Sequence, residues 1–297
     1  MKERKYSQRW FKKRAKNSFR RIDENTWDYS DSLLLYLPTG EELYESIQEE
    51  DTPYHALVTK PEHTYLKSVI SEIVSHLPKK FAYIDLGPGT EHKEQIFFDE
   101  FKKQEKEFVY VPVDINLNYL QKAREYSLGQ GIETIPIQSS FEELHKGLSV
   151  LDLPRVVNIG LTFSNYQPQK VIDLLKKIAG VDGYCLLNSQ MRDRVDMSSL
   201  LNVYGIEAKT LTNDKLLLLG FDLETDVSER WADDGFKVWC TALKNKEELG
   251  VKEGDKILLF QSLRYFKEEL EEELAKSGDK YMLFDNGSSF IAALIKD

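Results

Sequence analysis

The stretch Asp85-Leu86-Gly87-Pro88-Gly89-Thr90 decides the fold, because it stands where a buried strand turns into a helix. Phe81–Leu86 predicts the strand, and Ile96, Phe97 and Phe101 after the loop have helical spacing. Glycines at such a turn let the backbone bend tightly and approach a ligand closely. The amide groups that open the following helix then point toward that ligand.

The same alternation of strand and helix continues along the chain. Four further strands are predicted at Phe108–Asp114, Thr134–Gln138, Arg155–Gly160 and Tyr184–Asn188. Helices are expected through Leu117, Leu120 and Ala123, through Val171–Ile178, and at Lys267–Lys276. Five buried strands separated by helices indicate a parallel α/β sheet with helices on both faces. The loops that follow the strands then meet at one edge, where such sheets bind ligands.

The last part of the chain returns to β structure. Tyr281–Phe284 and Ser289–Ile295 flank Asp285-Asn286-Gly287, which is a hairpin signal. A sheet that ends in such a hairpin is the Rossmann-like plan of class I methyltransferases. Residues 20–60 and 191–264 lie outside the alternation. The second of these segments reads as irregular, with short strands at Leu216–Leu219, Lys237–Leu243 and Lys256–Ser262.

The glycine loop favours a nucleoside cofactor without phosphates. It lacks the third glycine of the dinucleotide motif and the Gly-Lys-Ser/Thr of a P-loop. Asp114 ends the second strand, where a carboxylate can accept hydrogen bonds from ribose hydroxyls. Ser139 and Ser140 follow the third strand, where a residue commonly faces adenine. Together these features predict S-adenosylmethionine (SAM) as the cofactor, although Asp114 read alone is also an ordinary helix cap.

Composition narrows the class of protein. The 297 residues carry a net charge of −10, with 41% hydrophobic and 30% charged residues, as in a globular protein. Two cysteines, Cys185 and Cys240, provide neither a disulfide framework nor a structural zinc site. The five histidines have no paired metal-ligand spacing, so no metal is predicted. No apolar run has the length of a membrane helix or a secretory signal, so we expect a cytoplasmic protein.

The first 21 residues differ sharply from the rest of the chain. They hold ten Lys or Arg and one acid, a charge of +9, so the remainder carries −19. This basic arm has three interpretations: a segment that is solvated or docks on the acidic body, a nucleic-acid contact, or an organellar targeting peptide. The sequence does not choose among the three, although the acidity of the body makes a nucleic-acid partner the less favoured interpretation.

Several longer stretches carry a more specific resemblance. They are Tyr36-Leu-Pro-Thr-Gly-Glu-Glu-Leu-Tyr44-Glu45, Asp85–Lys93, Tyr110–Ile115, Asn158-Ile-Gly160-Leu-Thr-Phe-Ser-Asn165 and Tyr204-Gly205. In their order and spacing, from about residue 33 to 270, the chain resembles the SAM-dependent histidine Nα-methyltransferases of ergothioneine biosynthesis. The chain thus looks like a divergent member of that family.

The resemblance implies an enzyme of two parts. A SAM-binding domain would comprise 61–190 and 265–297, and a discontinuous α+β domain of 22–60 and 191–264 would cover the substrate, with 1–21 as a separate arm. The cofactor-binding residues would be Asp85, Gly87, Gly89, Thr90, Lys93, Asp114, Ser139 and Ser140. The catalytic residues would be Asn165 and Tyr36, and the substrate would contact Tyr44, Tyr54, Gly160, Tyr204 and Gln261.

The departures from the family concern the acceptor. Where the family carries a Glu and a Ser that hold imidazole, this chain has Gln261 and Leu263. An imidazole needs hydrogen-bond partners for both ring nitrogens, and leucine provides none. The sequence therefore predicts an N-methyltransferase for a small amine or amino-acid-like substrate other than histidine. Two alternatives stay open: an inactive relative that acts through a partner, and an RNA or protein methyltransferase that uses the basic arm. The oligomeric state is not predicted.

Overall fold

The computed structural model of the chain describes residues 6–35, 46, 52–89, 92–144, 148, 152–224, 226–232 and 236–296, with the backbone alone at 204–211 and 228–232. The chain packs as two compact units, each made of two segments. Unit 1 comprises Met1–Tyr54 and Asp196–Arg264, and unit 2 comprises His55–Val195 and Tyr265–Asp297.

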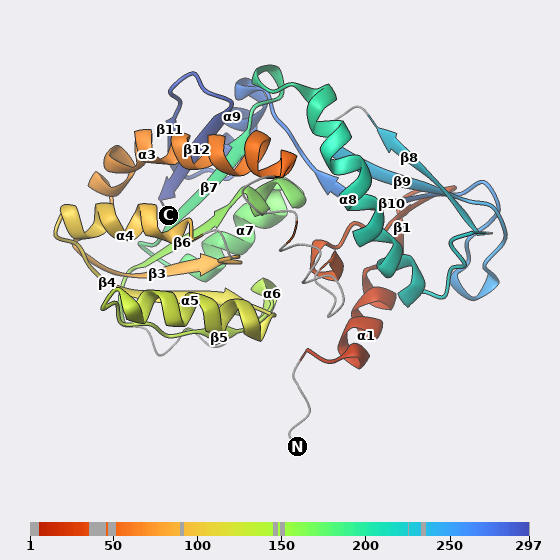
Figure 1. Ribbon diagram of the computed structural model, residues 1–297, viewed down its shortest axis with the longest axis horizontal. Coiled ribbons are helices and arrows are strands. Elements are labelled where there is room, and N and C mark those ends of the chain that lie inside the picture. Colours follow the sequence, from red (N-terminus) through yellow and green to blue (C-terminus); the bar gives the residue numbers. More distant parts are fainter. Residues whose placement is uncertain are drawn as a thin grey trace. The chain divides into compact units, whose positions relative to one another are not determined.

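A mostly parallel sheet forms the centre of unit 2 (Figure 1). Its described strands are β3 (Lys80–Leu86), β4 (Glu107–Asp114), β5 (Ile137–Gln138), β6 (Arg155–Gly160), β7 (Tyr184–Gln190), β11 (Lys280–Phe284) and β12 (Phe290–Lys296). They lie in the order β11-β12-β7-β6-β3-β4-β5. β12 runs antiparallel to both β7 and β11, and the other pairings are parallel. The predicted α/β sheet and its hairpin are confirmed.

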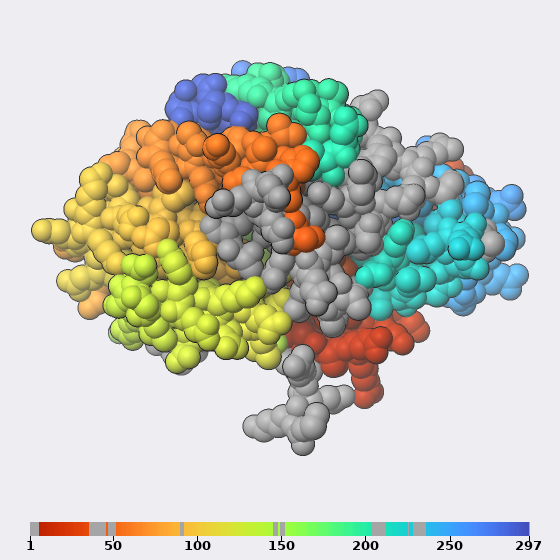
Figure 2. Space-filling model, in the orientation of Figure 1, coloured from red at the N-terminus to blue at the C-terminus, as the bar shows by residue number. Residues whose placement is uncertain are grey.

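Helices cover both faces of this sheet (Figure 1). The helical segments of unit 2 are η2 (a π-helix, His55–Thr59), α3 (Lys60–Ser75), α4 (Glu94–Lys103), α5 (Leu117–Gly129), α6 (Phe141–Leu144), η4 (Leu161–Asn165), α7 (Pro168–Ala179), η5 (Arg192–Arg194) and α9 (Lys267–Ala275). α3 packs against α4, and Figure 2 shows their orange and yellow segments side by side. Beneath them, Tyr83 and Phe81 of β3 pack on Phe97 and Phe101 of α4.

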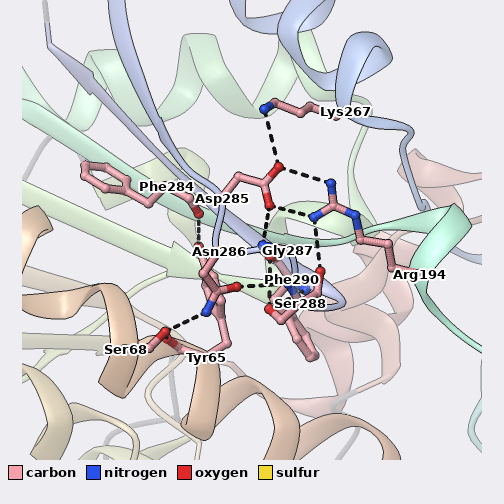
Figure 3. A network of polar contacts seen from close by, with 10 residues as sticks. All are labelled: Tyr65, Ser68, Arg194, Lys267, Phe284, Asp285, Asn286, Gly287, Ser288 and Phe290. Atoms are coloured by element: carbon pink, nitrogen blue, oxygen red, sulfur yellow. Dashed lines mark hydrogen bonds and ion pairs between the residues drawn. The ribbon is translucent and has the colours of Figure 1, made fainter.

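The turn of the hairpin is held by charged and polar side chains (Figure 3). Asp285 accepts hydrogen bonds from Arg194 at 2.6 and 3.1 Å and lies 3.3 Å from the Lys267 ammonium. Asn286 donates to Ser68 on α3 at 2.7 Å. The chain passes between the units at three points, and Arg194 and Lys267 stand close in sequence to two of them, so one carboxylate ties both of these segments to the hairpin.

Unit 1 combines a mixed sheet with helices. Its described strands are β1 (Arg20–Arg21), β2 (Thr26–Asp28), β8 (Val227–Ala232), β9 (Phe236–Ala242) and β10 (Lys256–Ser262), in the order β1-β2-β10-β9-β8. Its helical segments are α1 (Gln8–Ser18), η1 (Ser32–Leu35), α8 (Met197–Leu218) and η6 (Glu247–Leu249). The predicted strands at Lys237–Leu243 and Lys256–Ser262 are confirmed as β9 and β10.

The predicted strand at Leu216–Leu219 is wrong, because these residues end the 22-residue helix α8 and its cap. The same helix replaces much of the stretch expected to be irregular. Thr212, Lys215, Leu216 and Leu219 are buried, which is helical spacing. The pattern is not apparent in the sequence because a lysine, Lys215, occupies one of the buried positions. Its ammonium is buried and donates to the carbonyls of Leu259 and Asp31.

The basic arm contributes a helix to unit 1. Phe11 and Ala15 of α1 are buried, and Phe19 stacks on Trp27 at 4.9 Å. Arg14 forms an ion pair with Asp31. The described part of this arm, from Tyr6 onward, is thus packed within unit 1 at the positions that face inward.

Candidate active site

The glycine loop leaves the sheet at the end of β3. Gly87 has a φ of +75° and Gly89 a φ of +65°, the left-handed region that favours glycine. The Gly87 amide donates to Val113 of the neighbouring strand at 2.9 Å. Among the described residues, none comes within 4 Å of a Cβ atom built on Gly89. A ligand could approach the backbone there, as the sequence predicts.

Asp85 lies beneath this loop and is buried. Its two oxygens accept hydrogen bonds from the Tyr110 hydroxyl and the Asn158 amide, each at 3.1 Å. Burial, and secondarily the nearby Glu94, raises the pKa of Asp85 to about 7. Asn158 belongs to β6, so Asp85 links β3 with its parallel neighbour β6. The strands that follow β3 in the chain, β4 and β5, lie on one side of this pair, and the strand that follows β6, β7, lies on the other side, so the strand order reverses here. That reversal is where α/β sheets bind ligands.

Asp114 ends β4 on the same edge and is half-buried. One of its oxygens accepts the Asn116 amide at 2.8 Å, which fixes the turn into α5. The side-chain nitrogen of Asn116 is buried without a hydrogen-bond partner among the described residues. A carboxylate and an amide donor at one strand end suit a pair of ribose hydroxyls.

Ser139 and Ser140 follow β5 and are both buried. The Ser139 amide donates to the Asp114 carbonyl at 3.1 Å, which holds the two strand ends together. The Ser139 hydroxyl donates to the Ser140 carbonyl at 2.9 Å, and that carbonyl also accepts the Glu143 amide of α6. These contacts place Ser139 beside the end of β4 and Ser140 directly before α6.

Lys93 stands at the start of α4 and is partly buried. Its ammonium lies 3.0 Å from both carboxylate oxygens of Glu62, which belongs to α3. Glu62 also accepts the Asn188 amide of β7 at 3.0 Å. A Cβ atom on Gly160 would lie 3.5 Å from the Lys93 ammonium, so the lysine reaches the end of β6.

Gly160 and Asn165 bound the loop after β6. Gly160 has a φ of +54°, and its amide donates to the Asn158 side chain at 3.3 Å. Asn165 ends η4 and is partly exposed. Within unit 2, the structure therefore brings nine predicted residues to the carboxyl edge of the sheet: Asp85, Gly87, Gly89, Lys93, Asp114, Ser139, Ser140, Gly160 and Asn165.

The other predicted residues belong to unit 1 or lie outside the described residues. Gln261 is buried on β10, and Tyr54 is partly buried before η2. Tyr204 lies on α8, where its backbone alone is described. Tyr36, Tyr44 and Thr90 lie outside the described residues.

Three residues at this edge were not predicted from the sequence: Glu62, Tyr110 and Asn158 act through contacts with Lys93 or Asp85. Tyr110 and Asn158 each begin one of the resembling stretches, so a signal for both existed. Glu62 stands in a charged stretch at the start of a helix, and nothing in the sequence pairs it with Lys93. His92, between the loop and α4, stacks on Tyr126 with ring centres 4.1 Å apart. A hydrogen bond to Glu94 raises the pKa of His92.

Among the described residues, no cluster of three or more His, Cys, Asp or Glu side chains has the arrangement of a metal site. Within the same part of the chain, no helix is long and apolar enough to cross a membrane.

Comparison with protein families identifies the chain. Residues 24–190, more than half of the sequence, match the model for histidine-specific, SAM-dependent methyltransferases. The chain belongs to this methyltransferase family. The predicted family, enzyme class and SAM cofactor are thereby confirmed. No curated protein sequence matches the chain.

Several solved methyltransferase structures are similar to the chain. The CMeT domain of citrinin polyketide synthase is similar with a TM-score of 0.50 and 10% identity, over 88% of this chain and 57% of that one. A SAM-dependent methyltransferase from Clostridium acetobutylicum ATCC 824 has a TM-score of 0.45 and 15% identity, over 86% and 98%. An O-methyltransferase family protein from Burkholderia thailandensis has a TM-score of 0.44 and 10% identity, over 90% and 62%. The chain thus spans about three fifths of the first and the last of these.

Proposed function

We propose that this protein transfers a methyl group from SAM to the nitrogen of a small amine or amino-acid-like substrate other than histidine. The family match supports methyl transfer from SAM. One observation supports a changed acceptor: α8 and β10 contain acceptor positions, and where the family carries a Glu and a Ser that hold imidazole, this chain has Gln261 on β10 and Leu263 directly after it. Those elements carry Tyr204 and Gln261, which the family resemblance assigns to the acceptor.

The cofactor end of the site is assigned to unit 2. The left-handed backbone of Gly87 and Gly89 lets the cofactor approach the loop closely, and no described residue lies within 4 Å of a Cβ built on Gly89. Asp114 would hold the ribose, Ser139 and Ser140 would lie toward the adenine, and Lys93 would pair with the carboxylate of the amino-acid end. When bound, SAM supplies a methyl group on a positively charged sulfur.

The acceptor end needs a neutral amine held in line with that methyl group. Asn165 can accept a hydrogen bond from an amine through its carbonyl oxygen and donate to a carboxylate through its nitrogen. Gly160 leaves the end of β6 without a side chain. Tyr36, Tyr44, Tyr54 and Tyr204 would add hydroxyl groups and aromatic faces, which attract a methylated ammonium. We assign Asn165 and Tyr36 to orienting the amine.

The direct test is turnover. The protein is incubated with SAM and a metabolite extract, and products are examined by mass spectrometry for added methyl groups together with release of S-adenosylhomocysteine. We expect methylation of a small amine, and no tight binding of histidine in calorimetry. Tight histidine binding with trimethylated product would refute the changed acceptor. Methylation of RNA or protein alone, or no turnover with any acceptor despite SAM binding, would favour one of the two other interpretations.

Gln261 and Leu263 allow a converse experiment. The double substitution Gln261→Glu with Leu263→Ser restores a carboxylate and a hydroxyl, the groups that an imidazole requires. We expect the double variant to bind histidine at least about tenfold more tightly than the original protein, since each recovered hydrogen bond contributes about 1 kcal/mol. Each single substitution is the control, and equal histidine affinity in all four proteins would contradict the assignment.

A further inference from the structure

Glu62 and Lys93 form an ion pair that is almost fully removed from water. The Glu62 side chain is 1% exposed and the Lys93 side chain is 21% exposed. Both carboxylate oxygens lie 3.0 Å from the Lys93 ammonium. Removing a carboxylate from water is costly unless it is paired and hydrogen-bonded, and Lys93 provides this pairing for Glu62.

Asn188 completes this cluster from a third element. Its side-chain nitrogen donates to Glu62 at 3.0 Å. Its side-chain oxygen is buried and has no hydrogen-bond partner among the described residues. A carboxylate and an unpaired oxygen therefore stand together, and both favour a nearby hydrogen-bond donor.

The cluster stands beside the end of β6, next to the centre of the sheet. The Lys93 ammonium would lie 3.5 Å from a Cβ on Gly160, whose strand pairs with β3 of the glycine loop. The Lys93 ammonium and the Glu62 carboxylate, 3.0 Å apart, thus lie beside the edge where the ligand is expected. A ligand group that carries both charges at similar spacing is the amino-acid end of the cofactor.

We propose that Glu62 is a specificity-determining residue, which together with Lys93 matches the site to a zwitterion. Lys93 attracts the carboxylate of the amino-acid end, and the negative charge of Glu62 offsets the repulsion that Lys93 would exert on its ammonium. This inference rests on the part of the proposed function that places the cofactor's amino-acid end at Lys93. It is independent of which amine is methylated.

Three thioether ligands separate the two charges. S-adenosylhomocysteine carries both groups, its decarboxylated analogue keeps only the ammonium, and its deaminated analogue keeps only the carboxylate. Calorimetry gives the affinity of the whole protein for each. Glu62→Gln keeps the size of the side chain and removes its charge. We expect it to lower the affinity for the ammonium analogue relative to the carboxylate analogue by about tenfold or more, because removing the buried negative charge leaves the positive charge of Lys93 uncompensated.

Lys93→Met should shift the same ratio in the opposite direction. Glu62→Asp keeps the negative charge, so it should retain the original ratio even if it lowers the melting temperature. Glu100→Gln is the matched control, because Glu100 is also buried and lies 3.0 Å from a lysine, Lys103, near the far end of α4. This control should leave both affinities unchanged.

A purely structural Glu62 would weaken both analogues by the same factor in the Glu62→Gln variant, and that result would overturn the proposal. If Glu62→Gln does not fold, an unchanged ratio in Lys93→Met would overturn it as well. Failure of the original protein to bind S-adenosylhomocysteine would refute the cofactor site itself. Tight ligand binding without methylation of any amine would refute only the proposed acceptor and leave the result on Glu62 standing.

Discussion

The carboxylate of Asp85 shows how a single residue can couple the active-site edge to pH. Burial raises the pKa of Asp85 from its ordinary value of 3.8 to about 7 in the folded chain, so Asp85 keeps its proton to a higher pH in the folded than in the unfolded state. The contribution of Asp85 to the free energy of unfolding is therefore fully present below about pH 4, and it is lost as the pH rises toward and through 7.

Asp85→Asn removes this dependence while keeping the side-chain shape, since an amide can accept from Asn158 and donate to the Tyr110 oxygen. We expect the variant to gain stability over the original protein as the pH rises from 4 to 7, by a few kcal/mol at most. Chemical denaturation at several pH values measures this difference. A difference that is constant across this range would show that Asp85 is charged in the fold.

Asp114 and Asn165 should separate the two ends of the reaction. Asp114→Ala removes the proposed ribose contact and should weaken SAM binding about tenfold or more, because a charged hydrogen bond contributes about 1.5–3 kcal/mol. Asn165→Ala should leave SAM affinity nearly unchanged and reduce use of the amine. Calorimetry with SAM and turnover with the amine test the pair, and an equal loss of SAM affinity in both variants would contradict their roles.

Residues that act through their own position in a strand or loop are predictable from the sequence. Gly87, Gly89 and Asp114 belong to this kind, because a glycine turn and a strand-ending acid have local signatures. Glu62 is different, since its partners Lys93 and Asn188 come from elements that only the fold brings together. A pattern along the chain does not show which distant residues come into contact in the fold.

At the level of elements, apolar runs predicted the parallel strands well. β6 begins and ends where the sequence predicts, since Arg155 and Gly160 are distinct boundaries. α8 was missed because Lys215 occupies a buried helical position. Its ammonium donates to backbone carbonyls, and the sequence does not show that such partners are present. α3 was also not predicted, although Tyr65, Leu66, Val69, Ile70 and Ile73 give it a regular buried stripe.

The hairpin element should depend on Asp285. Its side chain is 14% exposed, and hydrogen bonds from Arg194 hold its pKa far below the usual value. A lowered pKa stabilises the fold above about pH 4, and this contribution is lost as the pH falls further. Asp285→Asn should therefore cost about 2 kcal/mol at pH 7, and the cost should shrink in acid.

Thermal unfolding at pH 7 and at pH 3 measures the effect. Glu107→Gln is the contrasting variant, because Glu107 and its partner Lys80 are both largely exposed, and such pairs contribute little. Equal effects of the two substitutions at pH 7 would mean that the polar network around the hairpin adds no stability.

At the level of the whole molecule, the basic arm is tied to unit 1 by its apolar residues. Phe11→Ala should destabilise unit 1 by about 3 kcal/mol, as in other buried Phe→Ala changes, while Lys12→Ala on the exposed face should have little effect. Limited proteolysis with mass spectrometry shows which unit opens first. Unchanged protection of unit 1 in Phe11→Ala would mean that α1 packs too weakly to matter.

The position of β12 has a consequence for how the chain is made. β12 follows its neighbours in the sequence yet lies between β7 and β11 in the sheet. Until residues 290–296 leave the ribosome, β7 presents an unpaired edge that other chains can join. Synthesis therefore passes through a stage at which the central strands have formed but the sheet stays open to aggregation, and chaperones that shield strand edges would act on it then.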